Sequence, residues 1–126
     1  MNDIAGVIED AFEQRFDMTP ENVDPTVRSA IEAAVAALDS GEARVAEKRD
    51  GEWVVNEWLK KAVLLSFRVA DNRVMAGGFT QYFDKVAMKF TDTNKQQMAE
   101  AGVRVVPPAC ARKGAYIAPG VVLMPS

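Results

Sequence analysis

Apolar residues recur three and four positions apart in the N-terminal third of the chain. In the segment Asp3–Phe16 they are Ile4, Val7, Ile8, Ala11 and Phe12. This spacing places them on one face of an amphipathic helix. Asp24-Pro25 then supplies an N-cap followed by proline at the first helical position, and Gly41 supplies a stop signal. The pattern therefore predicts two successive helices that form a helical hairpin.

The apolar spacing changes to a two-residue alternation in the segment Ala43–Val55. Within it, Asp50-Gly51 separates two short runs, and Asp-Gly in this setting is a strong signal for the turn of a β-hairpin. Asn56 is then placed to cap a third helix that contains Trp58, Leu59, Ala62, Val63, Leu64 and Phe67. We expect Trp53 and Trp58 to anchor the hairpin to this helix in the core, because large aromatic side chains dominate small cores.

The next part of the chain is less regular. Turns are expected at Asp71-Asn72 and Gly77-Gly78. Phe79–Phe90 has no clean period and is expected to be irregular, with at most a short strand. Thr91 or Asp92 can cap a last helix that ends near Ala101, and Gly102 follows as its left-handed C-terminal residue.

A six-residue period begins after Gly102. One series is formed by Val105, Ala111, Ile117 and Leu123, and a second by Ala109, Ala115 and Val121. This is the hexapeptide pattern of a left-handed parallel β-helix, in which three repeats make one triangular coil. Val105–Val122 supplies about one coil, and roughly three repeats must stack before a solenoid buries a core. We therefore expect an extended, truncated β-helix that is poorly ordered, paired with another copy, or folded back on the helices.

These patterns predict an α+β fold. Residues 1–102 would form a small helical N-terminal domain with a β-hairpin, and residues 103–126 would begin a left-handed parallel β-helix that this chain leaves incomplete. The simplest interpretation is that the sequence is a fragment of a longer protein.

Composition narrows the function. The chain has 126 residues, 15 basic against 18 acidic, and a net charge of −3, which argues against nucleic-acid binding. Its apolar runs are too short for a membrane span, and its N-terminus lacks the basic start of a signal peptide. It has no histidine and one cysteine, so we expect neither a metal site nor a disulfide, and a reducing cytoplasm fits.

Three stretches carry a more specific signal, namely "LDSGEARVAEKRDGEWVVNEWLKKAVLLSFRV", "YFDKVAMKF" and "VRVVPPACARKGAYIAPGVVLMPS". They closely resemble the 2,3,4,5-tetrahydropyridine-2,6-dicarboxylate N-succinyltransferase family, the succinyl-transfer enzymes of bacterial lysine and diaminopimelate synthesis. The resemblance covers essentially the whole chain. Trp58–Phe67 and Arg104–Pro108 are its most specific parts. Other hexapeptide enzymes, such as nucleotidyltransferases and sugar acyltransferases, would share the repeat but not Trp58–Phe67.

The resemblance implies a homotrimeric cytoplasmic transferase whose active sites lie between neighbouring β-helices. Succinyl-CoA would be a co-substrate that acylates the amine of the ring-opened acceptor L-2-amino-6-oxopimelate. No permanently bound cofactor is implied. The resemblance places the catalytic acid and most of the coenzyme A groove in coils beyond this chain, so we expect no catalytic residue here. It assigns the arginine of the "RVVPP" motif, Arg104, to the dicarboxylate acceptor. A guanidinium fork suits a carboxylate, and Pro107-Pro108 would hold the segment extended.

Other residues have plainer explanations. Lys60-Lys61 could clamp a phosphate, but on a helix such a pair more often forms the solvated face. Cys110 is more simply a structural thiol than a reactive one. Gly77-Gly78 lacks the setting of a phosphate-binding loop. Arg68 and Arg73 flank a turn, and their spacing does not support a substrate role.

Two functions remain open. The chain is either part of an enzyme, contributing Arg104 to the acceptor site, or a non-catalytic cap that supports acceptor binding and oligomer packing. In both cases we expect the 126-residue chain alone to be inactive.

Overall fold

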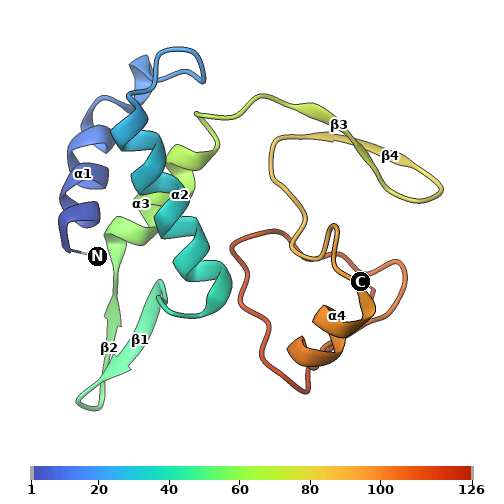
Figure 1. The fold of residues 1–126 in the computed structure, drawn as a ribbon. Coiled ribbons are helices and arrows are strands. Elements are labelled where there is room, and N and C mark those ends of the chain that lie inside the picture. The colour runs from blue at the N-terminus through green and yellow to red at the C-terminus, as the bar shows by residue number, and fades with distance from the viewer. Residues whose placement is uncertain (1, 126) are drawn as a thin grey trace.

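The computed structural model describes residues 2–125. Three helices pack together at one end of the molecule: α1 (Asn2–Glu13), α2 (Pro25–Ser40) and α3 (Glu57–Ser66) (Figure 1). Their most deeply buried large side chains are Ile8, Ile31, Leu59 and Leu65. The three- and four-residue apolar spacing of the first helix therefore predicted the face with which α1 enters this core, where Ile8 and Ala11 are buried.

The first two helices begin and end close to the sequence signals. Asp24 caps α2, accepting a hydrogen bond from the Thr26 amide at 2.8 Å, and Gly41 ends it with a φ of 82°. The first helix is shorter than Asp3–Phe16, because it ends at Glu13 and a 3-10 turn, η1 (Arg15–Asp17), follows. The helical hairpin is confirmed, with this shorter first arm.

The predicted β-hairpin is also present. Strands β1 (Ala46–Arg49) and β2 (Glu52–Val55) pair antiparallel around Asp50-Gly51. Both turn residues have positive φ, 51° for Asp50 and 81° for Gly51, as the favoured two-residue hairpin turn requires. The Asp-Gly pair therefore determined the position of this hairpin.

Two expectations around the hairpin are met only in part. Trp53 is 71% exposed, so it is no core anchor, whereas Trp58 packs against the helical core. Asn56 lies at the N-cap of α3 but makes no capping hydrogen bond. Its side-chain amide instead donates to the Arg44 carbonyl at 2.7 Å and to Glu47 at 2.8 Å. Asn56 thus ties the hairpin to the start of α3.

A second hairpin follows α3. Strands β3 (Arg73–Ala76) and β4 (Gln81–Asp84) pair antiparallel, and the Gly77 amide closes the turn on the Thr80 carbonyl at 2.9 Å. The turn at Gly77-Gly78 was predicted, but β3 was not. Its strands are four residues long and largely exposed, so they carry no clear pattern of buried positions.

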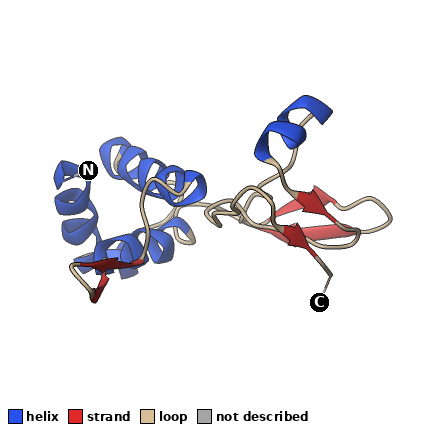
Figure 2. Cartoon of the chain, turned by 90° about the horizontal axis from the view of Figure 1, so that it is seen from below, coloured by secondary structure: helices blue, strands red, loops and turns tan. Residues whose placement is uncertain are grey.

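The last helix, α4 (Lys95–Ala101), is capped by Asn94 rather than by Thr91 or Asp92. Asn94 and Gln97 form a reciprocal capping box, in which each side chain accepts a hydrogen bond from the other's backbone amide. Gly102 ends the helix in the left-handed conformation, as predicted. Figure 2 shows α4 and the later strands at the end of the molecule away from the helical bundle.

The segment with the six-residue period contains one parallel strand pair. Strands β5 (Arg104–Val105) and β6 (Val122–Leu123) pair in parallel, with Arg104 opposite Val122. Partners in this register are three hexapeptides apart along the chain. Between these strands the described residues form turns and no further strand, apart from one isolated bridge that joins Arg112 to Met88, a residue before α4.

The expectation of a continuously extended segment after Val105 is wrong at the prolines. The Ala109 amide donates to the Val106 carbonyl at 2.7 Å, which closes a turn over Pro107-Pro108, whose peptide bond is cis. Further along, Gly114 contacts the C-terminal end of α2, since its amide donates to Asp39 at 2.8 Å. Part of the segment therefore folds back on the helical bundle.

Candidate functional site

Arg104 lies on β5 with its side chain exposed. Its backbone is fixed, because its amide donates to the Val121 carbonyl at 3.1 Å. Just before it, the Gly120 amide donates to the carbonyl of Gly102, the residue that ends α4, at 2.7 Å. Helix α4 and the parallel pair therefore hold the Arg104 backbone while its side chain stays free to reach a ligand.

The guanidinium of Arg104 is not engaged by acidic side chains of the described chain. Four ion pairs join residues within 2–125, and none of them includes Arg104. An arginine in this state keeps its charge at any working pH and offers a planar fork of N–H donors. Arg104 can thus take a carboxylate in two parallel hydrogen bonds.

Only Lys60 of the lysine pair on α3 fits the expected solvated face. Lys61 donates to Glu9 of α1 at 2.6 Å, and this hydrogen bond raises the pKa of Lys61 above its ordinary value. Lys60 is exposed on the outer face of the helix. Lys61 therefore joins two helices.

Cys110 is exposed, and its thiol lies 3.6 Å from the Pro108 carbonyl oxygen. A hydrogen bond between Cys110 and the Tyr82 hydroxyl raises the pKa of Tyr82. The thiol thus links the second hairpin to the turn after β5. Arg73, at the start of β3, is exposed.

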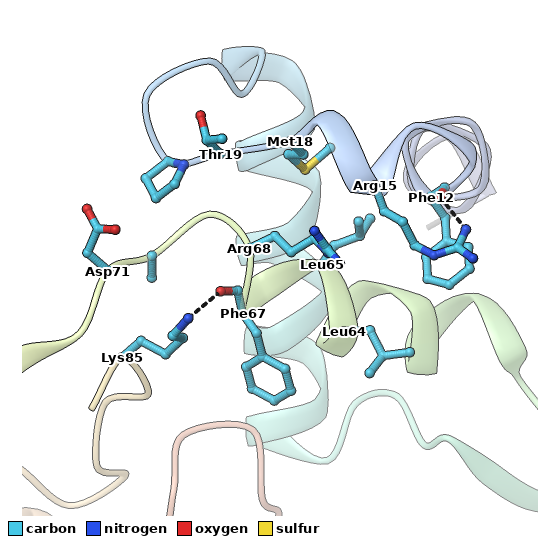
Figure 3. A pocket seen from close by; sticks show the side chains of 12 residues that line it. Phe12, Arg15, Met18, Thr19, Leu64, Leu65, Phe67, Arg68, Asp71 and Lys85 are labelled. Atoms are coloured by element: carbon cyan, nitrogen blue, oxygen red, sulfur yellow. Dashed lines mark hydrogen bonds between the residues drawn. The ribbon is translucent and has the colours of Figure 1, made fainter. Parts of the chain in front are cut away.

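Sequence reasoning missed a cavity at the end of α3. It has a volume of about 580 Å³, and Figure 3 shows the side chains that line it. Three cations line it: Arg15 from η1, Arg68 just after α3, and Lys85 from the segment after β4. The sequence pattern around Arg68 did not support a substrate role for it. These residues are far apart in the sequence, so no local motif could have revealed the cluster.

No group of three or more His, Cys, Asp or Glu side chains suited to a metal ion occurs among the residues that the structure describes. Within the same residues, no helix has the length and apolar character to cross a membrane.

Comparisons with known proteins agree on one family. Residues 3–69 match the family described as tetrahydrodipicolinate N-succinyltransferase N-terminal. The 2,3,4,5-tetrahydropyridine-2,6-dicarboxylate N-succinyltransferase of Alkalilimnicola ehrlichii is 64% identical over 120 residues, which cover 95% of this chain and 44% of the relative. The enzyme of the same name from Thioalkalivibrio sulfidiphilus is 60% identical over 124 residues, or 98% of this chain and 45% of the relative.

A third relative of that name, from Actinobacillus succinogenes, is 56% identical over all 126 residues, and the match covers 46% of its length. The chain thus spans less than half the length of the curated relatives that it matches. The family match covers more than half of the chain, and the similarity to these relatives continues through the parallel pair that carries Arg104. The chain therefore belongs to the tetrahydrodipicolinate N-succinyltransferase family.

Proposed function

We propose that this chain is the N-terminal part of a cytoplasmic, homotrimeric N-succinyltransferase. The whole enzyme would transfer succinate from succinyl-CoA to the amine of L-2-amino-6-oxopimelate, the ring-opened form of tetrahydrodipicolinate, in the succinylase branch of diaminopimelate and lysine biosynthesis. Support for the reaction comes from the names of the relatives, all of which state an N-succinyltransferase acting on the dicarboxylate.

Within this reaction, the role of Arg104 is to bind one carboxylate of the acceptor. The observation that carries this proposal is an exposed guanidinium, outside every ion pair of the described residues, on a strand whose backbone is hydrogen-bonded to the segment around β6. A dicarboxylate acceptor presents two charged ends, and fixing one of them leaves the amine near the other end to be aligned with the thioester. Alignment of this kind supplies a large part of the barrier reduction in enzymatic acyl transfer.

The parallel pair supports a β-helix that starts at β5. Arg104 and Val122 are partners three hexapeptides apart, which is the separation of stacked residues in successive coils of a hexapeptide solenoid. In a complete β-helix, later coils would continue this stack and cover the exposed apolar side chains of β6. The catalytic acid and most coenzyme A contacts would lie on those later coils.

A test uses the full-length enzyme and measures thiol release from succinyl-CoA. Arg104→Ala should raise the KM for the acceptor about tenfold to a hundredfold, the range expected for a lost hydrogen bond to a charged group. The KM for succinyl-CoA should stay unchanged. Arg104→Lys should restore part of the affinity, because it keeps the charge but loses the fork.

Lys48→Ala is the matched control, because Lys48 is an exposed cation on β1, far from β5 in the fold. An unchanged acceptor KM in Arg104→Ala would overturn the assignment of Arg104. Equal effects of Arg104→Ala and Lys48→Ala would point to general charge attraction instead.

A second candidate function is a non-catalytic cap that aids acceptor binding and oligomer packing. It is favoured by the surroundings of Arg104, where the described chain places no acidic side chain within ion-pair distance. The two candidates differ in one outcome. A cap that acts mainly through packing predicts that Arg104→Ala weakens assembly of the full-length protein, measured as its oligomeric state, more than it raises the acceptor KM.

A further inference from the structure

The cavity at the end of α3 gathers positive charge in a chain that is acidic overall. Three cations line it, Arg15, Arg68 and Lys85, against a single carboxylate, Asp71. All three cations are half-buried, whereas Asp71 is exposed at the rim. The net charge of the whole chain is −3, so this local excess is opposite in sign to the protein that surrounds it.

None of these three cations is neutralised by an acidic side chain of the described residues. The four ion pairs within residues 2–125 use other bases. One N–H of Arg15 donates to the Phe12 carbonyl at 2.8 Å, and Lys85 donates to the Phe67 carbonyl at 3.0 Å. Both groups keep further donors, so the cavity holds more N–H donors than these carbonyls satisfy.

The guanidinium groups of Arg15 and Arg68 both lie against one aromatic ring, that of Phe16. Phe16 is 73% exposed, and the Arg15 and Arg68 guanidinium carbons lie 4.5 and 5.1 Å from its ring centre. Arg15 also lies 4.1 Å from the centre of the Phe12 ring. Cation–π contacts of this kind orient a guanidinium while leaving its N–H edge free for an anion.

The remaining wall is apolar. Phe12, Leu64 and Phe67 line the cavity beside the cations (Figure 3). Its volume, about 580 Å³, falls within the range of small-molecule sites, which combine apolar walls with a few placed polar groups. A bare inorganic ion would use the cations but leave this wall uncovered.

We propose that this cavity binds a small organic dianion with an apolar part, through its carboxylate or phosphate groups. The anionic groups contact Arg15, Arg68 and Lys85, and the apolar part covers Phe12, Leu64 and Phe67. The site is separate from Arg104, because it is built from η1, α3 and the segment after β4, none of which includes β5. It does not depend on the function proposed for Arg104.

Isothermal titration calorimetry on the 126-residue chain at low salt tests the proposal. The probes are phenyl phosphate and phenylsuccinate, compared with inorganic phosphate and succinate, which lack the ring. We expect saturable binding of a ring-bearing probe, at least threefold tighter than the matched anion without a ring. Whichever ring-bearing probe binds more tightly assigns the site to phosphate or to carboxylate chemistry.

Variants locate the binding in the cavity. Arg68→Gln and Lys85→Gln should each weaken it about tenfold, the loss expected for one charge-assisted hydrogen bond. Because the two variants lie on different elements, a folding defect in one of them does not decide the test. Circular dichroism checks that each variant is folded. Lys60→Gln, an exposed charge loss on α3 itself, should leave binding unchanged.

Three results would overturn the proposal. The first is no saturable binding of either ring-bearing probe, and the second is equal affinity for the probes with and without the ring. The third is a loss in Lys60→Gln as large as in Arg68→Gln, which would reduce the effect to general charge attraction.

Discussion

Lys89 and Asp39 connect the two ends of the molecule through a paired set of hydrogen bonds. The Lys89 ammonium donates to the Asp39 carboxylate at 2.9 Å and to its backbone carbonyl at 2.7 Å. The same carboxylate oxygen accepts the Gly114 amide at 2.8 Å. One carboxylate at the end of α2 therefore holds both the segment before α4 and the segment after β5.

Asp39→Ala should destabilise the chain by about 2 kcal/mol, because it leaves the Gly114 amide without its acceptor and the half-buried Lys89 ammonium with only the backbone carbonyl of residue 39. The side chains of Lys89 and Asp39 are only 12% and 27% exposed, so water replaces the lost contacts poorly. Urea unfolding measures the total effect, and hydrogen exchange of the Gly114 amide should accelerate. Asp10→Ala, an exposed change on α1, is the control and should alter neither quantity.

Gly41→Ala should destabilise the chain more than Gly51→Ala does. Both glycines have left-handed backbones, with φ of 82° and 81°, so alanine costs about 1–2 kcal/mol at either position. At Gly41 a Cβ would also lie 2.6 Å from the Tyr116 ring, whereas at Gly51 it meets nothing within 4 Å. The Tyr116 ring would have to move away from the Arg44 guanidinium, 4.3 Å from its centre.

Thermal unfolding of both variants tests this prediction. An extra loss of about 1 kcal/mol or more is expected for Gly41→Ala from overpacking. The extra loss should disappear when Tyr116→Ala is the starting protein. If both variants lose the same stability, Tyr116 does not pack against the end of α2.

The parts of the fold that sequence predicted are those where a single residue imposes a local geometry. Proline at the first turn of α2 and the Asp-Gly turn each require one backbone conformation, so their positions could be predicted without knowledge of the rest of the chain. Gly102 ends α4 for the same reason. The cap of α4 was missed because Asn94 is selected by its partner Gln97, and Thr91 and Asp92 carry equally good capping side chains.

Contacts between distant segments could not be predicted in this way. Trp53 was expected in the core because of its size, but its place on β2 leaves it exposed. The candidate site shows the same limit. Arg104 was found through a motif of neighbouring residues, whereas Arg15, Arg68 and Lys85 meet only because η1, α3 and the segment after β4 converge.

Glu47→Gln should make the stability of the fold change less with pH in the acid range. Hydrogen bonds from Arg49 and then from Asn56 lower the pKa of Glu47 in the folded chain below its ordinary value of 4.5. The ionised carboxylate therefore stabilises the fold above that ordinary value. This contribution is lost as pH falls through the lower folded pKa.

Urea midpoints measured from neutral pH down to acid pH test this prediction. The wild-type midpoint should fall more steeply than that of Glu47→Gln in the acid range. Arg49→Gln should remove part of the difference, because it removes the largest cause of the lowered pKa. Parallel profiles for wild type and Glu47→Gln would mean that the hairpin carboxylate is not linked to folding.

The last prediction concerns turnover by the 126-residue chain. Acyl transfer needs the thioester and the acceptor amine held in line, and positioning of this kind can supply about 7–11 kcal/mol of barrier reduction at best. In the described chain, Arg104 is exposed and forms no ion pair with an acidic side chain that could act on the amine. A single exposed arginine–carboxylate contact contributes only about 0–1 kcal/mol in water, which is too little to hold the acceptor.

We therefore expect no detectable thiol release when the chain is mixed with succinyl-CoA and acceptor. The full-length enzyme, assayed in parallel at equal molar concentration, is the positive control. Adding the 126-residue chain to the full-length enzyme should leave the rate unchanged, because we expect the chain neither to bind the acceptor nor to compete for it. Turnover by the chain alone, abolished by Arg104→Ala, would show instead that residues 1–126 contain a working acyl-transfer site, because no contaminating enzyme would respond to that substitution.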